Sequence, residues 1–303
     1  MQKSFFLFSL LLIVFCSCKH ISKTLPAEVK GFPVDSTLQV VCNLPSKVDE
    51  SSGIIYWNGK IWTHNDSKKQ AALFEVNPTD GELISTLPIA TLSNQDWEEV
   101  AQDEQYIYIG DFGNNHGTRK NLKIFKVSKQ EIVTTKAVQR VDTIHFTYPD
   151  QTNFEGPTHA HNYDCEAMIT AGDSLYLFTK NFKDQQSRLY SLPKTPGKYA
   201  AQLKGRFNTQ GTITGASINR VDRVVGLSGY FYDEGNFLPF VWWLWDYPEQ
   251  DFFSGKKQRI NLPHHVQVEG ICYDKDGQFF ISSESSLLKA GQLFKADARQ
   301  WLE

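Results

Sequence analysis

The chain has 303 residues, with 31 Lys and Arg residues against 34 Asp and Glu residues and a formal net charge of −3. Its basic residues form no run or stripe, which excludes an electrostatic surface for nucleic acid, so no nucleic-acid partner is expected. The length suits one large domain, and all-β folds of this size are commonly single domains.

The N-terminus predicts export and a lipid anchor. After Lys3, an apolar run from Phe5 to Phe15 has the length of a signal-peptide core and is too short to span a bilayer. It ends in "FCSC", which resembles a bacterial lipoprotein box with cleavage before Cys18 and lipid on that thiol; a plain secretory signal cut nearby is the alternative. We expect a signal peptide over residues 1–17, a polar tether over 18–34 and the folded domain over 35–303.

Five segments along the rest of the chain share one pattern. Each begins with polar or acidic residues, continues with apolar positions and a turn, and ends in an alternating strand. Turns such as Asn58-Gly59, Gly172-Asp173 and Asp276-Gly277 are strong hairpin signals. The segments are "ESSGIIYWNGKIWTHND", "DWEEVAQDEQYIYIGDF", "DCEAMITAGDSLYLFTKN", "TITGASINRVDRVVGLSGY" and "QVEGICYDKDGQFFISSE".

The spacing of these segments predicts the fold. Their equivalent positions are 46, 68, 48 and 55 residues apart, close to the length of a four-stranded propeller blade. Two further strand-like runs follow every segment except the last, which has one, "GQLFKADA". A strand in "STLQVVCNLP", residues 36–45, can fill that place and close the ring. We therefore expect an all-β, five-bladed β-propeller closed by an N-terminal strand joining the last blade; a β-sandwich is the rival architecture.

The same alignment predicts a ring of oxygen ligands at one end of the propeller tunnel. Three carboxylates close to one axis repel one another, and a hard divalent cation such as Ca²⁺ would offset their charge. The alternative is that these groups cap strands or bind water in the tunnel. The expected Ca²⁺ ligands are Ser52, Glu98, Glu166, Thr214 and Glu269, with Glu50, Asp96, Asp164, Thr212 and Gln267 as a second set of oxygens two residues earlier.

The second strand of each segment returns to the same end, so its last residues should surround the ion. Asp66, Asp111, Lys180 and Glu284 are candidates for catalytic or ligand-binding roles there, beside Tyr230. Within the second segment, Trp97 should pack into the core, and Glu99 is interpreted as an ordinary polar residue.

Other residues that bind metals or react give weaker signals. His159 with His161 and His264 with His265 lie in predicted loops and lack the spacing of a helical zinc site, so a transition-metal site is disfavoured. Cys42, Cys165 and Cys272 lie in strand-like runs and are expected to be buried free thiols, with one disulfide left as an alternative. No Gly-x-Ser-x-Gly elbow or phosphate-binding glycine loop occurs.

The ring of Ser, Glu, Glu, Thr and Glu resembles that of the calcium-activated nucleotidases, the apyrase family of five-bladed propellers. "SSGIIYWNGKIWTHND", "DWEEV", "DCEAM" and "VEGICY" are similar to that family's motifs on blades one, two, three and five, and Thr214 stands where the family has serine. The resemblance implies a central Ca²⁺. However, "NDSKK" and "FTKN" lack the family's phosphate-binding basic residues, and Lys180 is one cationic substitute. The motifs "WTHNDS" and "YIGDFGNN" also resemble those of uncharacterised propeller lipoproteins of Bacteroidetes-type bacteria.

These observations predict a monomeric cell-envelope lipoprotein, anchored in the outer membrane and facing the periplasm because no acidic run follows Cys18. The lipid bilayer is its expected partner. In one interpretation the mouth binds a small-molecule, glycan or peptide ligand. In the other the chain is a Ca²⁺-dependent hydrolase of a phosphate ester, phosphoanhydride, lactone or ester, with Asp66, Asp111 or Glu284 as base and Lys180 stabilising charge.

Overall fold

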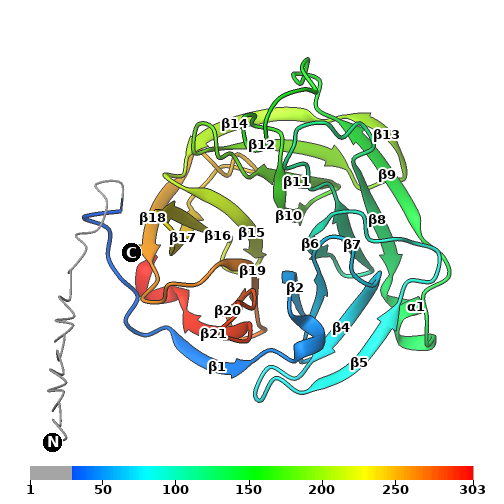
Figure 1. Ribbon diagram of the computed structural model, residues 1–303, viewed down its shortest axis with the longest axis horizontal. Coiled ribbons are helices and arrows are strands. Elements are labelled where there is room, and N and C mark those ends of the chain that lie inside the picture. The colour runs from blue at the N-terminus through cyan, green and yellow to red at the C-terminus, as the bar shows by residue number, and fades with distance from the viewer. Residues whose placement is uncertain (1–28, 303) are drawn as a thin grey trace, which may run out of the picture.

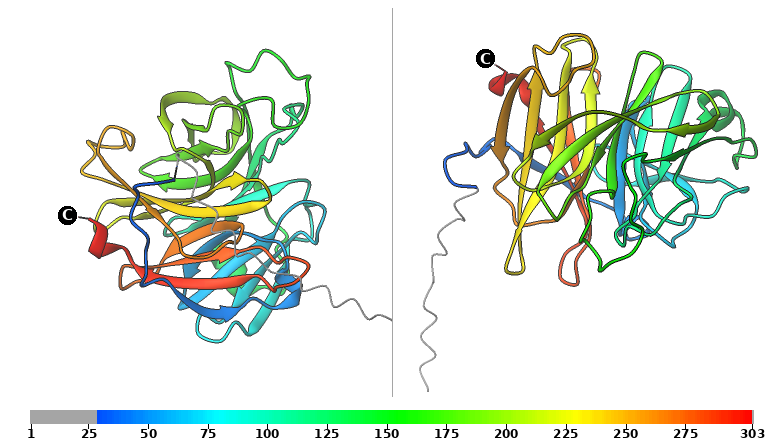
Figure 2. Two further views of the ribbon diagram at one scale, coloured as in Figure 1. Left: turned by 60° about the vertical axis from the view of Figure 1, so that its left-hand side comes forward. Right: turned by 90° about the horizontal axis from the view of Figure 1, so that it is seen from above.

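A computed structural model describes residues 29–302 and contains five β-sheets arranged in a ring (Figure 1). The innermost strands of the five sheets contact one another around the central axis. Figure 2 shows the strands running between the two ends of the ring, which we call its mouths. The predicted five-bladed β-propeller is confirmed, and the rival β-sandwich is wrong.

Each blade has the predicted antiparallel order, from the axis outward. Blade 1 contains β2 (Ser51–Trp57), β3 (Lys60–Asn65), β4 (Ala72–Val76) and β5 (Leu83–Pro88). Blade 2 contains β6 (Trp97–Gln102), β7 (Tyr106–Asp111), β8 (Lys123–Ser128) and β9 (Asp142–Thr147), with α1 (Lys129–Thr134) between the last two. Blade 3 contains β10 (Cys165–Ala171), β11 (Ser174–Thr179), β12 (Gln186–Pro193) and β14 (Gln202–Asn208). Blade 4 contains β15 (Thr212–Asn219), β16 (Val224–Asp233), β17 (Asn236–Trp245) and β18 (Lys256–Asn261).

Blade 5 joins the two ends of the described chain. Its strands β19 (Val268–Tyr273), β20 (Gln278–Ser283) and β21 (Gln292–Asp297) come from the C-terminal region, and β1 (Gln39–Asn43) supplies the outer strand. β1 pairs antiparallel with β21, so that Val40 lies opposite Phe294. The predicted closure by an N-terminal strand is therefore confirmed, and it leaves no unpaired seam in the ring.

One strand exchange between blades was not predicted. β13 (Gly197–Ala200) pairs in parallel with β9 as a fifth strand of blade 2, although it lies between two strands of blade 3 in the chain. Main-chain hydrogen bonding thus ties blade 2 to blade 3.

The described N-terminal residues differ from the expected tether. Val34 forms a parallel bridge with Asn261, and the Phe32 ring lies edge-on to Trp242 at 6.1 Å. Residues 29–34, placed in the tether from the sequence, thus pack against blade 4, because Phe32 and Val29 find apolar partners there. The predicted signal peptide, Cys18 and the first part of the tether lie outside the described residues. The described residues include no helix with the length and hydropathy of a membrane span.

The core lies between neighbouring blades. The buried apolar side chains form five clusters, and each cluster joins two adjacent sheets around the ring. Trp97, for example, is fully buried between blades 1 and 2, as predicted. Cys42, Cys165 and Cys272 are free thiols, two of them buried.

Asp103 is a polar link between blades 2 and 3 whose removal should lower stability. Its carboxylate accepts hydrogen bonds from Lys194 Nζ and Tyr108 Oη, both at 2.9 Å, and from two backbone amides of its own turn. Burial alone would raise the pKa of Asp103, but these donors together lower it to about 2. We expect Asp103→Asn to lower the free energy of unfolding at pH 7 by about 1–2 kcal/mol.

The pH dependence of this difference follows from the direction of the shift. Because the folded pKa is depressed, the stabilisation is complete above the unfolded value near 4 and is lost as the pH falls toward 2. Urea unfolding of both proteins at pH 7 and at about pH 3 should show the difference shrinking. Glu104→Gln, in the same turn, is the control, and an equal difference at both pH values would contradict this account.

Candidate functional site at the acidic mouth

All five predicted ring positions coincide with a β-bulge. In every blade the pairing of the innermost strand with its neighbour gains one extra residue, around Ser52, Glu98, Glu166, Thr214 and Glu269. An extra residue re-aims the side chains beside it, and such bulges are common next to functional sites. The ring residues are all at least 96% buried, and they lie at the same mouth because each stands near the start of its strand. We call this end the acidic mouth.

The two hydroxyl members of the ring connect neighbouring blades. Ser52 Oγ donates to the carbonyl oxygen of Glu98 at 2.6 Å, and Thr214 Oγ1 donates to the carbonyl oxygen of Val268 at 2.8 Å. Each hydroxyl therefore binds the main chain of the next blade, and its lone pairs remain available as acceptors. The two hydroxyls therefore link neighbouring blades, and their oxygens can still bind a cation.

Glu98 is the ring glutamate with an unused buried oxygen. Its Oε1 is buried and has no hydrogen-bond partner within the described residues. The backbone of Gly113 passes so close that a Cβ there would lie 2.0 Å from this oxygen and 2.6 Å from Asp96 Oδ2. A glycine at position 113 thus leaves room for both carboxylates, where the other blades place side chains such as Asp66 and Lys180.

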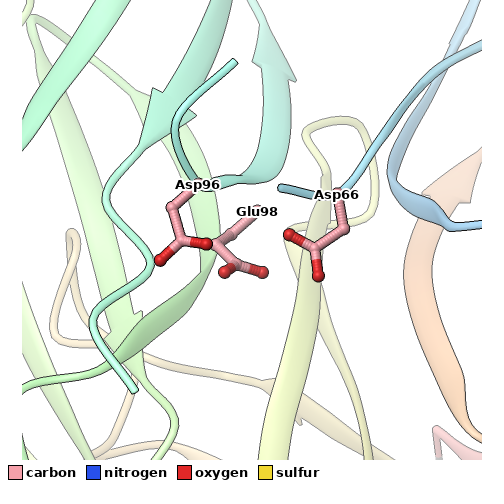
Figure 3. A group of neighbouring side chains, drawn as sticks. All are labelled: Asp66, Asp96 and Glu98. Atoms are coloured by element: carbon pink, nitrogen blue, oxygen red, sulfur yellow. The ribbon is translucent and has the colours of Figure 1, made fainter. Parts of the chain in front are cut away.

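Three carboxylates converge beside Gly113. Oxygen atoms of Asp66, Asp96 and Glu98 all lie within 4.8 Å of one another, and Figure 3 shows the three side chains turned toward one point. They come from blades 1 and 2, so the group lies to one side of the five-membered ring. Among the described residues it is the only group of three or more His, Cys, Asp or Glu side chains with this spacing.

Lys180 lies on the other side of the same mouth. Its Nζ is 2.5 Å from Glu166 Oε2, and both side chains are more than 90% buried. Burial opposes the charge of Lys180, but Glu166, Tyr230, Glu269 and Asp164 together raise its pKa well above the ordinary value. The positive charge of Lys180 therefore offsets part of the carboxylate repulsion for which the sequence analysis proposed Ca²⁺.

The remaining carboxylates are difficult to ionise together. Burial, followed by repulsion from neighbouring carboxylates, raises the pKa of Glu98 well above its ordinary value. Burial likewise raises the pKa of Glu269, whose Oε1 accepts a hydrogen bond from Gln267 Nε2 at 2.8 Å. Burial also raises the pKa of Asp66 and Asp164 to about 6 and that of Glu284 to about 7. Lys180 and Arg119, whose Nη1 lies 3.8 Å from Asp96 Oδ2, offset only part of this charge.

The structure brings together most of the predicted mouth residues. Asp66, Lys180, Tyr230 and Glu284 stand at equivalent ends of the second strands, and each interacts electrostatically with at least one ring glutamate. Asp111 is fully buried at the end of β7, where its carboxylate pairs with Arg119 at 2.7 Å and with Lys123 at 3.5 Å, and Arg119 also lies 3.8 Å from Asp96. These two cations neutralise the Asp111 carboxylate, and its catalytic role stays a prediction.

His159 and His161 are held by contacts with neighbouring loops. His159 Nε2 bonds the Asn115 side chain at 2.8 Å and its ring stacks on Phe182, while His161 Nε2 bonds the Asn115 carbonyl. These contacts join the loop before β10 to the loops after β7 and β11, and the prediction that a transition-metal site is disfavoured stays a prediction.

Glu99 is the important residue that the sequence interpretation missed. It is fully buried, its Oε1 accepts from the backbone amide of Val100, and its Oε2 accepts from that of Ala216 in blade 4, both at 2.9 Å. A Cβ on Gly53 would lie 2.3 Å from Glu99 Oε1, so the carboxylate fills the tunnel where blade 1 has no side chain. The interpretation of Glu99 as an ordinary polar residue is wrong, because the bulge turns it as well as Glu98 toward the axis.

Comparisons with known proteins address the fold. No family model matches the chain, and no curated protein matches its sequence. Among solved structures, a glucose dehydrogenase superposes with a TM-score of 0.50 at 7% identity, over 86% of this chain and 99% of that one. The likeness establishes the fold alone. A hypothetical protein from Leishmania major covers 86% of this chain and 91% of its own at 14% identity, with a TM-score of 0.48.

Proposed function

We propose that the chain is a cell-envelope lipoprotein whose propeller holds Ca²⁺ at the acidic mouth and binds a ligand there. The observation that carries the proposal is the buried, unpartnered Oε1 of Glu98, which lies beside Gly113 and close to Asp66 and Asp96. A buried acceptor without a donor is costly, and a cation removes that cost together with the repulsion between the three carboxylates.

The residues present fit a calcium ion. Carboxylate and hydroxyl oxygens are the ligands that Ca²⁺ prefers, and no nitrogen or sulfur ligand belongs to the group. Glu98, Asp66 and Asp96 would hold the ion, which shifts the proposed site from the middle of the ring toward blades 1 and 2. Bound there, Ca²⁺ would supply a positive charge that attracts an anionic or hydroxyl-rich ligand.

The chain's own residues would orient such a ligand at the same mouth. The Lys180 ammonium is fixed against Glu166, and the Tyr230 and Phe182 rings both lie 5.5 Å from Lys180 Nζ. A cation beside aromatic faces is a common arrangement for binding polar ligands with an apolar part. A lipid anchor at Cys18 would hold this mouth near the membrane surface.

Hydrolysis is the second candidate function. It is favoured by Glu284, whose burial raises its pKa to about 7, close to what a general base needs at neutral pH. The motif resemblance to calcium-activated nucleotidases adds nucleotides to the substrates worth testing. Assays with nucleotides, phosphate esters, lactones and aryl esters decide between the two functions. Ca²⁺-dependent turnover that is lost in Glu166→Gln supports hydrolysis. Inactivity toward every substrate supports the ligand-binding function.

Calcium should raise the thermal stability of the chelator-treated protein. At a Ca²⁺ concentration about 100 times Kd, binding adds about 2.7 kcal/mol, or about 5 °C in Tm for a domain of this size. Differential scanning calorimetry should show this rise, and chelator should reverse it. Glu98→Gln should abolish the calcium-induced rise in Tm, whereas Glu104→Gln, at the opposite end of the ring, should keep it. An unchanged Tm in the parent protein would exclude the ion.

A further inference from the structure

The opposite mouth contains a cavity that the proposed function does not use. It has a volume of about 480 Å³. Residues from the C-terminal ends of all five innermost strands line it, including Tyr56, Gln102, Thr170, Ile218 and Tyr273. We call this end the second mouth. Glu99 lies between this cavity and the acidic mouth, since Val100 and Ala101, which follow it, line the cavity floor. The volume is within the range of small-molecule sites.

Arg220 reaches across the second mouth and is held there by one nitrogen. From the turn after β15, its Nη2 donates to the carbonyl oxygen of Gln102 at 2.9 Å and to that of Thr170 at 3.0 Å, and it also contacts Thr170 Oγ1. These acceptors belong to blades 2 and 3, so the side chain spans from blade 4 over the cavity. This anchoring fixes the guanidinium plane, while Nε and Nη1 make no hydrogen bond within the described residues.

Arg220 also lacks a counter-ion. No carboxylate of the described residues lies within ion-pair distance of its guanidinium, and burial lowers its pKa although Asp103 and Glu104 act in the opposite direction. The other cations on the cavity rim are paired: Lys275 with Asp276 at 2.9 Å and Arg299 with Asp297 at 2.5 Å. Three carboxylates also line the cavity, and each has a partner: Asp222 accepts from Asn219 Nδ2 at 2.8 Å, Asp274 pairs with Lys295 at 3.6 Å, and Asp276 pairs with Lys275.

We infer that the second mouth binds a small molecule through an oxyanion group, carboxylate or phosphate, held by Arg220. With Nη2 engaged, Nη1 and Nε lie on different edges of the guanidinium, and the two Nη1–H donors can bind an oxygen of the anion next to the positive charge. The Tyr56 and Tyr273 rings and Ile218 line the same cavity and can contact the remainder of the molecule. This site is separate from the acidic mouth and does not depend on Ca²⁺.

Calorimetric titration of the full chain with inorganic phosphate and with succinate tests the inference. Both titrations are run in chelator at constant ionic strength, so that the result is independent of the acidic mouth. We expect one probe to bind, and Arg220→Met to weaken it at least tenfold. Phosphate binding indicates a phosphorylated ligand, and succinate binding indicates a carboxylic acid.

Two variants make the test specific. Arg220→Lys keeps the charge but loses the planar group that the Gln102 and Thr170 carbonyls hold in place, so its affinity should lie between those of the parent and Arg220→Met. Arg223→Met is the matched control: it lies in the same turn, but its Nη2 binds the Tyr247 carbonyl at 2.9 Å, away from the cavity, and it should bind like the parent. Absence of binding by both probes, or equal affinity in Arg220→Met of parental stability, would overturn the inference.

Discussion

Replacing Glu99 by alanine is expected to lower the free energy of unfolding by about 4 kcal/mol. The carboxylate accepts backbone N–H groups from Val100 and, across the tunnel, from Ala216, and Met168 of blade 3 adds a third. Without it these buried donors lose their side-chain acceptor. Urea unfolding of the parent and Glu99→Ala measures the loss.

The neighbouring glutamate provides the control for this prediction. Glu98→Gln, measured in chelator, should leave stability unchanged or raise it, because Glu98 Oε1 accepts no hydrogen bond and its charge is repelled by Asp66 and Glu166. Glu99→Gln should fall between, at about 2 kcal/mol, since an amide offers one acceptor oxygen where the carboxylate offers two. If Glu98 and Glu99 responded alike, the assignment of Glu99 as the residue that fills the tunnel would be wrong.

Replacing Lys180 by methionine should be the other costly change, at about 3–5 kcal/mol in chelator. The ammonium lies against Glu166 and offsets Asp164 and Glu269, and its loss leaves buried carboxylates without a counter-charge. Added Ca²⁺ should restore part of the stability, so the calcium-induced rise in Tm should be larger than in the parent. Thermal and urea unfolding, with and without Ca²⁺, measure both effects.

A double-mutant cycle isolates the Lys180 and Glu166 pair. Glu166→Gln combined with Lys180→Met should recover much of the loss, because both members of the buried pair are then neutral. Lys183→Met, three residues later and exposed, should leave stability unchanged. Strictly additive single-variant effects would show that the ion pair carries no coupling.

The sequence predicted the architecture because the repeat is a local signal. Turn residues and alternating strands marked four of the five blades completely, and the missing strand in the last blade pointed to residues 36–45, where β1 lies. The strand exchange that places β13 in blade 2 was beyond such reasoning, since local patterns do not specify which distant edge a short strand joins.

The candidate site was predicted in part, for a related reason. Aligning the segments brought Glu98, Glu166 and Glu269 to one mouth, but an alternating pattern does not reveal an extra residue, so the bulge that brings Glu99 into the tunnel was missed. A signal was present: Gly53, Gly215 and Gly270 follow the ring position in three blades, and only blade 2 has a large side chain there. Asp111 was misplaced because Arg119 and Lys123, its partners, lie in the following loop and strand.

A crystal structure of the full chain soaked in millimolar Ca²⁺, with anomalous scattering used to locate the ion, tests the central claim most directly. We predict one calcium at the acidic mouth, about 2.3–2.6 Å from oxygens of Glu98 and at least one of Asp66 and Asp96, with Lys180 still against Glu166. A mouth that contains only water under these conditions, with Glu98 hydrogen-bonded as a neutral acid, would contradict it.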